Sequence, residues 1–123
     1  MKISDKLEII RNDIYQKDEK NDCKRFFLSS ILHFAISLEV SIGHFNESYI
    51  AYEKICENIP KKFGSRSTIQ TILNESIHHK FFIKEISKKD KRIKIYKLSN
   101  DYAFMIEQWI DFHQKNIEKY QAA

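Results

Sequence analysis

The sequence contains very few of the residues that make tight turns, with two glycines and one proline among 123 residues. Proteins with many β-strands need frequent turns, so this scarcity argues against such a fold and favours long helices with few breaks. A chain of this length is expected to form one domain with a modest hydrophobic core.

Cysteine is also scarce, and the two that are present, Cys23 and Cys56, lie too far apart to form a CxxC pair. This usage predicts a reduced, cytoplasmic protein rather than a secreted one. No apolar run approaches the roughly 18 residues of a membrane span, and the N-terminus lacks a signal-peptide pattern. We therefore expect neither secretion nor a membrane partner.

The sequence lacks the motifs of common metalloproteins and enzymes. Its five histidines form no HExxH pattern and have no paired cysteines beside them, so we expect no metal site. The chain has no glycine-rich phosphate loop and no recognisable catalytic arrangement. These absences predict a protein that is not an enzyme and that has no cofactor.

Basic charge is concentrated in one part of the chain. Residues 61–97 hold eleven Lys or Arg and three Asp or Glu, which gives this segment a net charge of +8. Because the whole chain carries +4, the remainder carries −4. A basic segment in an otherwise acidic protein is typical of a nucleic-acid-binding surface.

The N-terminal half favours three helices. The first begins at Ser4 or Asp5 as the N-cap and carries a narrow apolar stripe. The second is expected over residues 22–42, and Gly43 is expected to end it. The third is expected over residues 48–60. The stripe of the first helix consists of Ile3, Leu7, Ile10 and Ile14.

A short turn precedes a helix whose outward residues are polar but mostly uncharged. Gly64 is expected in a left-handed turn, and Ser65 is a good N-cap for a helix over residues 66–77. A merely solvated helix would favour Glu and Lys on its outer side, whereas small polar groups suit a helix that reads base edges. The outward residues are Arg66, Ser67, Gln70, Thr71 and Asn74.

Two alternating apolar stretches follow, at residues 81–87 and 92–98, and a charged turn joins them. They predict a β-hairpin. Ser99 or Asn100 then caps a last helix expected over residues 101–120. The order is therefore helix, short turn, helix and charged hairpin, which is the order of a winged helix-turn-helix domain.

The chemistry of these segments indicates double-stranded DNA as the partner. In the major groove, Arg66 could pair with guanine, and Gln70 or Asn74 could pair with adenine. Hydroxyl groups at the helix N-terminus suit a phosphate, and the hairpin turn would place its cations over a phosphate ridge or in the minor groove. The expected DNA-contacting residues are Lys61, Lys62, Ser65, Arg66, Ser67, Thr68, Gln70, Thr71, Asn74, Lys88, Lys89, Asp90, Lys91 and Arg92.

Three short motifs carry a resemblance to a known family. The segments Ser65-Arg66-Ser67-Thr68-Ile69, Asp90-Lys91-Arg92 and Tyr96-Lys97-Leu98-Ser99 resemble the recognition helix, wing tip and last strand of the MarR-like winged helix transcriptional regulators. The resemblance covers about residues 48–99 and implies that Asp90 braces Arg92, which would enter the minor groove. The chain departs from the family at His78-His79-Lys80, where a glycine is usual.

The resemblance also implies a homodimer that forms through the N- and C-terminal helices. The stretches involved would run from Leu7 to Ile14 and from Ile106 to Ile117. Symmetric DNA-binding proteins commonly pair in this way. No residue identifies a small-molecule effector.

The expected fold is mainly α with a small β-hairpin, in a single domain. An N-terminal helix would occupy residues 1–20, a winged helix-turn-helix core residues 22–99, and a C-terminal helix residues 100–123. The favoured function is sequence-specific DNA binding by a homodimeric transcriptional regulator. The alternative is a winged helix adaptor that docks an acidic protein. RNA binding ranks lower, because no exposed aromatic pair resembles a base-stacking platform.

Overall fold

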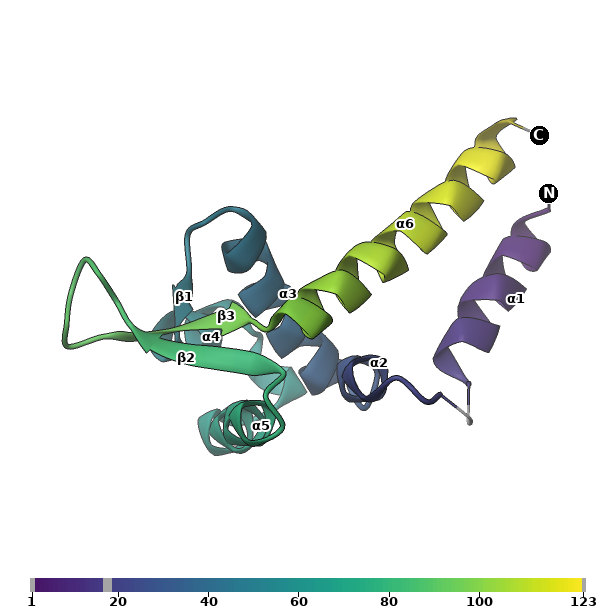
Figure 1. Cartoon of the computed structure of the whole chain (residues 1–123). Coiled ribbons are helices and arrows are strands. Elements are labelled where there is room, and N and C mark those ends of the chain that lie inside the picture. Colours follow the sequence, from purple (N-terminus) through teal and green to yellow (C-terminus); the bar gives the residue numbers. More distant parts are fainter. Residues whose placement is uncertain (1, 17–18, 123) are drawn as a thin grey trace.

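A computed structural model describes the backbone of residues 2–16 and 19–122, with side chains as far as residue 115 within those ranges. It consists of helices around a small sheet, as expected from the sequence (Figure 1). The elements are α1 (Ile3–Ile14), α2 (Asp22–Phe27), α3 (Ile31–Phe45), β1 (Ile50–Ala51), α4 (Tyr52–Asn58), the short 3₁₀ helix η1 (Lys61–Phe63), α5 (Arg66–His78), β2 (Phe82–Ile86), β3 (Lys94–Leu98) and α6 (Asn100–Ala122).

The sheet is antiparallel and has the strand order β1-β3-β2. Strands β2 and β3 form the expected hairpin, in a register that places Phe82 opposite Leu98. Strand β1 was not expected; it pairs two residues with β3, placing Ile50 opposite Tyr96. The hairpin therefore leaves the body of the protein from a strand that is held on both sides.

The hydrophobic core lies between the sheet and the helices α2 to α6. Helix α1 buries none of its side chains there. The first turns of α6 belong to this core, because Tyr102, Met105 and Ile106 are buried. The remaining buried apolar residues are Phe26, Phe27, Leu32, Ile36, Val40, Ile55, Ile59, Ile69, Ile72, Leu73, Phe82, Tyr96 and Leu98.

Helices α1 and α6 lie side by side and project from one end of the body, while the loop between β2 and β3 projects from the opposite end (Figure 1). The Asp13 carboxylate fastens α1 to α6, because it accepts hydrogen bonds from Trp109 Nε1 at 2.9 Å and from His113 Nε2 at 3.2 Å. Lys24 Nζ on α2 lies 2.6 Å from the same carboxylate. Burial alone would raise the pKa of Asp13, but these three partners outweigh burial and lower it.

One expected helix is in fact two. The sequence predicted a continuous helix over residues 22–42, but α2 ends at Phe27 and α3 begins at Ile31. Ser30 has extended backbone angles, and its hydroxyl caps α3 by accepting from the backbone N–H of His33 at 3.1 Å. The apolar pattern continues across this break, which is why periodicity alone did not indicate it.

Both glycines have roles other than those expected. Gly43 does not end a helix; it is buried inside α3, and a Cβ atom there would lie 2.7 Å from the carbonyl oxygen of Ser48. Gly64 is not left-handed, because its φ of 163° is extended backbone. A Cβ atom at Gly64 would lie 2.5 Å from Cδ2 of Leu32. Each glycine therefore permits close packing rather than a turn.

The boundaries of two other helices also differ from expectation. The helix expected over residues 48–60 is shortened to α4, because residues 50 and 51 belong to β1 and Ile59 is extended before Pro60. Helix α1 has Lys2 at its N-cap position, and Asp5 accepts from the backbone N–H of that residue at 3.1 Å. Within the described part of the chain, no helix is long and apolar enough to cross a membrane.

Candidate nucleic-acid interface

Helix α5 begins with a cluster of hydroxyl groups. As predicted, Ser65 is the N-cap, and its Oγ accepts from the backbone N–H of Thr68 at 3.2 Å. The same Oγ lies 3.0 Å from the hydroxyl oxygens of both Ser67 and Thr68. The first-turn N–H groups and the helix dipole make this end of α5 suitable for a phosphate.

The outer face of α5 is a polar stripe opposite its buried side. The buried side holds Ile69, Ile72, Leu73 and Ser76. On the opposite side, Ser67, Thr71 and Asn74 are exposed, and His78 continues the same line at the end of the helix. Sequence reasoning left His78 out of the site, although its spacing of eleven residues from Ser67 places it on the same face.

Gln70 and Asn74 are brought together, but they do not point in the same direction. Gln70 Nε2 donates to Asn74 Oδ1 at 2.9 Å. The Gln70 side chain is half-buried and also hydrogen-bonds the Tyr96 hydroxyl on β3. Burial raises the pKa of that hydroxyl and the bond from Gln70 opposes the change. Asn74 is thus exposed on the outer face, whereas Gln70 lies along the seam between α5 and the sheet.

Arg66 is held by two residues of the preceding helix. Its Nη1 lies 2.9 Å from Glu53 Oε2, and the Tyr52 hydroxyl donates to the Arg66 carbonyl oxygen at 3.1 Å. Hydrogen bonding and charge attraction to Glu53 raise the pKa of the guanidinium. Glu53 precedes Arg66 by thirteen residues, so sequence spacing gave no indication of this contact.

Lys61 and Lys62 lie in η1, between the two helices of the helix-turn-helix. Both side chains are exposed, and Lys62 Nζ lies 5.4 Å from the centre of the Phe63 ring. They border an open cavity of about 820 Å³ that also reaches Cys56 and Arg66. The predicted cations are therefore adjacent to the N-terminus of α5.

The wing, residues 87–93, is a loop tied together by its own polar groups. Ser87 Oγ accepts from the backbone N–H of Lys89 at 3.2 Å. The Asp90 carboxylate accepts from Arg92 three times, from the backbone N–H at 3.0 Å, from Nε at 3.1 Å and from Nη2 at 3.0 Å. These bonds lower the pKa of Asp90. The Arg92 side chain stays 89% exposed, so it is oriented without being covered.

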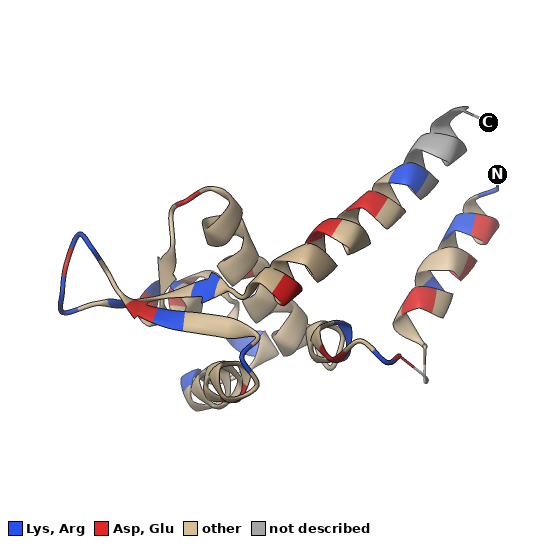
Figure 2. Ribbon diagram, viewed as in Figure 1, with Lys and Arg blue, Asp and Glu red and all other residues tan. Residues whose placement is uncertain are grey.

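Three exposed lysines of the hairpin lie on this wing, whereas a lysine near its base is held in an ion pair. Near the base, Lys97 Nζ is 2.8 Å from Glu85 Oε2 and 4.4 Å from the centre of the Tyr49 ring. At the wing, Lys88, Lys89 and Lys91 are exposed and have no acidic partner among the described residues. Figure 2 shows the resulting cluster of basic charge on the loop.

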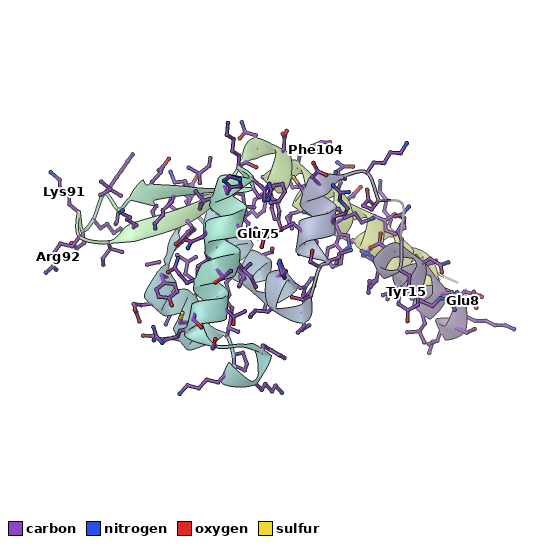
Figure 3. All side chains as sticks on the ribbon, turned by 90° about the horizontal axis from the view of Figure 1, so that it is seen from below. Glu8, Tyr15, Glu75, Lys91, Arg92 and Phe104 are labelled. Atoms are coloured by element: carbon purple, nitrogen blue, oxygen red, sulfur yellow. The ribbon has the colours of Figure 1, made fainter. Side chains whose placement is uncertain are left out.

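The polar stripe of α5 and the wing lie away from the projecting helices α1 and α6. Figure 3 looks directly onto α5, on which Glu75 is labelled, and shows Lys91 and Arg92 at the wing tip beyond one side of that helix. Tyr15 and Glu8 of α1 lie at the opposite end of the same view. A duplex that contacts α5 and the wing would therefore leave α1 free.

The described residues contain no group of three or more His, Cys, Asp or Glu side chains arranged to hold a metal ion. His33 instead hydrogen-bonds the Ser30 hydroxyl, with 2.7 Å between its Nδ1 and the oxygen. His44 Nδ1 accepts from the backbone N–H of Leu98 at 3.1 Å. Both histidines therefore have partners within the protein.

No family model and no curated protein matches the sequence. Solved structures do match. The S. aureus MepR–DNA complex has a TM-score of 0.61 at 13% identity, covering 98% of this chain and 86% of that one. A Lactococcus lactis ZitR mutant has a TM-score of 0.59 at 17% identity, covering 98% and 78%. The adhesin competence repressor AdcR of Streptococcus pyogenes has a TM-score of 0.51 at 11% identity, covering 99% and 81%.

These likenesses extend over nearly the whole chain, so they include the terminal helices as well as the helix-turn-helix and the wing. The winged helix fold that the MarR-like resemblance implied is therefore confirmed. At such low identity a shared fold does not by itself assign a function, which has to be argued from the site.

Proposed function

We propose that this protein is a homodimeric, sequence-specific double-stranded DNA-binding regulator of transcription. The observation that carries the proposal is the wing, where Asp90 orients an exposed Arg92 beside three lysines that have no acidic partner in the described structure. Lysine and arginine side chains that release counterions from phosphates supply most of the affinity of DNA-binding proteins. An oriented guanidinium also suits the negative potential of a narrow minor groove.

The outer face of α5 supports a role in reading sequence. Its exposed stripe presents the hydroxyl groups of Ser67 and Thr71 and the amide of Asn74, which suit base edges in the major groove. Arg66 stands at the start of the same helix and suits guanine. The Ser65 end suits a phosphate, which would fix the register of the helix on the duplex.

The fold likeness supports the same function by analogy. One of the matched structures, MepR of S. aureus, was solved in complex with DNA. In a winged helix bound to a duplex, the second helix of the helix-turn-helix lies in the major groove. Here that helix is α5, which carries the polar stripe.

The terminal helices support the homodimer. Helix α1 exposes Ile3, Leu7 and Ile14, at 62%, 60% and 50%, and α6 exposes Ile110 at 51%. Such apolar surface is typical of an interface with another copy. The range expected in α6 needs adjustment, because Ile106 is buried in the core of its own chain. The side chain of Ile117 lies outside the described residues.

The proposal is tested by measuring the affinity of the purified protein for duplex DNA at several salt concentrations. We expect affinity to fall steeply with salt. Replacing Arg92 by Ala should weaken binding to all duplexes and reduce the salt slope by about 1. The matched control is Arg25→Ala, which removes an exposed guanidinium paired with Asp22 on α2.

Equal losses in both variants would contradict a wing contact. An absence of binding to any duplex at low salt would overturn the proposal. Capture of an acidic protein through the wing, lost in the Arg92→Ala variant, would then favour the adaptor function instead.

A further inference from the structure

We propose that Glu53 is a specificity-determining residue, which positions Arg66 for a base and discourages its contact with phosphate. This inference rests on the proposed DNA-binding function and assigns a role to a residue outside the set expected from the sequence. Glu53 lies in the first turn of α4, the helix that packs beside the start of α5.

The geometry restrains both ends of Arg66. The Tyr52 hydroxyl holds its carbonyl oxygen at 3.1 Å, and Glu53 Oε2 holds its Nη1 at 2.9 Å. The side chains of Arg66 and Glu53 are 56% and 69% exposed, so the pair faces solvent. An arginine anchored at its backbone and at one guanidinium nitrogen has few orientations left.

A guanidinium has five N–H donors in a fixed plane, and the hydrogen bond to Glu53 uses one nitrogen, Nη1. The other nitrogens remain available for the two acceptors of a guanine edge, O6 and N7. Glu53 and a base can therefore hold Arg66 at the same time. Without Glu53, the Arg66 side chain would lose its conformational freedom only on binding, and this entropy cost would be subtracted from the binding free energy of the correct base.

The negative charge of Glu53 also favours contact with a base over contact with a phosphate. A carboxylate beside Arg66 neutralises part of the attraction between the guanidinium and any nearby phosphate, and the carboxylate itself is repelled by the DNA backbone. Contacts to phosphate are the same for every sequence, whereas contacts to a base edge are not. By weakening the phosphate contacts, which supply the sequence-independent affinity, Glu53 increases the ratio of specific to non-specific affinity.

An ordinary structural role for Glu53 makes different predictions. Acidic residues favour the first turn of a helix through the helix dipole, and exposed ion pairs stabilise a fold only slightly. If Glu53 served the fold alone, its replacement would change thermal stability a little. Discrimination between DNA sequences would then stay the same.

The test compares two glutamates on the same helix. Glu53→Gln removes the charge beside Arg66, and Glu57→Gln removes an equal charge whose nearest partner is Lys54 Nζ, at 3.7 Å. Each variant is titrated with a duplex selected from a random library by the wild-type protein, and with a scrambled duplex of the same length. The measured quantity is the ratio of the two dissociation constants.

We expect Glu53→Gln to tighten binding to the scrambled duplex and to reduce the ratio by about tenfold, the size of one good base contact. Glu57→Gln should tighten both affinities equally and leave the ratio unchanged. In an Arg66→Ala background, Glu53→Gln should no longer alter the ratio, because the residue through which Glu53 acts is absent.

Two results would overturn the inference. One is an unchanged ratio in Glu53→Gln when the wild type discriminates clearly between the duplexes, which leaves the proposed function intact. The other is an equal loss of discrimination with or without Arg66. A wild-type protein that selects no duplex from the library at low salt overturns the proposed function itself, so the two failures are distinguishable. Circular dichroism and the urea midpoint check that every variant is folded.

Discussion

At the scale of single residues, the His44 side chain serves as the hydrogen-bond acceptor for a backbone N–H of the sheet. Its Nδ1 accepts a hydrogen bond from the backbone N–H of Leu98 in β3. Strand β1 pairs with β3 only as far as Tyr96, so this N–H lies just beyond the paired residues. Only neutral imidazole offers an acceptor nitrogen. Burial and the nearby Lys97 charge lower the pKa of His44, while Glu107 opposes them. Folding therefore favours the neutral side chain.

This contact predicts a dependence of stability on pH. Histidine in an unfolded chain has a pKa of about 6.5, and the folded pKa is lower, so the unfolded state binds more protons in acid. The contribution of His44 to stability is complete above about pH 6.5 and is lost as the pH falls through the folded pKa. Urea unfolding at pH 7.5 and pH 5.5 measures the change.

Two variants isolate this contribution from that of the other histidines. His44→Asn keeps an acceptor and removes the titration, so its stability should fall less than that of the wild type between the two pH values. His44→Leu leaves the Leu98 N–H unpaired and should cost about 1–3 kcal/mol at pH 7.5. An identical pH response in the wild type and in His44→Asn would contradict the proposed cause.

Residues that act locally could be predicted from the sequence, and residues that act across the fold could not. The cap at Ser65 was predicted, and the cap of α6 was narrowed to Ser99 or Asn100, because a cap depends on neighbours three residues away. Ser65 and Ser99 both accept such a bond. By contrast, Glu53 and Arg66 are 13 residues apart, and His44 and Leu98 are 54 residues apart. Spacing along a chain carries no signal for such contacts.

At the scale of elements, the crossing of α3 and β1 depends on Gly43. A Cβ atom at this position would lie 2.7 Å from the backbone oxygen of Ser48 and 3.3 Å from the backbone nitrogen of Ile50. Ser48 lies in the loop just before β1 and Ile50 begins the strand, and these backbone atoms cannot move aside as a side chain can. The close approach lets β1 pair with β3, so Gly43 indirectly supports the base of the wing.

We expect Gly43→Ala to destabilise the protein by about 1–3 kcal/mol, even though alanine favours helix by up to about 1 kcal/mol over glycine. Gly64→Ala is the matched control, since its Cβ atom would meet the end of the Leu32 side chain, which can rotate. Urea unfolding should rank Gly43→Ala as the less stable variant. The reverse order would show that β1 yields more easily than Leu32.

The elements themselves were predicted unevenly, for physical reasons. Helix α5 and the hairpin were predicted because each has a clear period and a terminating signal. Strand β1 spans only two residues, too few for any period to be read. The break between α2 and α3 was missed because apolar residues continue through it, and only the cap at Ser30 marks it.

At the scale of the whole molecule, the cations of the wing and the apolar stripe of α1 lie at opposite ends. The segment of residues 61–97 was predicted as basic from composition, and three of its exposed lysines, Lys88, Lys89 and Lys91, lie with Arg92 on the wing (Figure 2). The exposed apolar residues of α1 lie at the other end, where α1 and α6 project. A second copy joined there would leave both wings free to contact one duplex.

This arrangement predicts that dimerisation and DNA binding fail together when the apolar face of α1 is altered. Leu7 is 60% exposed, and α1 buries no side chain in its own chain, so Leu7→Glu should leave the fold intact. Sedimentation equilibrium should show half the wild-type mass. Affinity for a palindromic duplex should fall steeply, because a monomer contacts one half-site instead of two.

The control for this change is Ile42→Glu, which places the same charge at a residue that is 59% exposed on α3, a helix of the central body. It should keep both the wild-type mass and the wild-type affinity. A Leu7→Glu protein that keeps its dimeric mass would mean that another surface joins the two copies. If that protein were monomeric but bound the palindrome as tightly as the wild type, one wing and one recognition helix would suffice for binding.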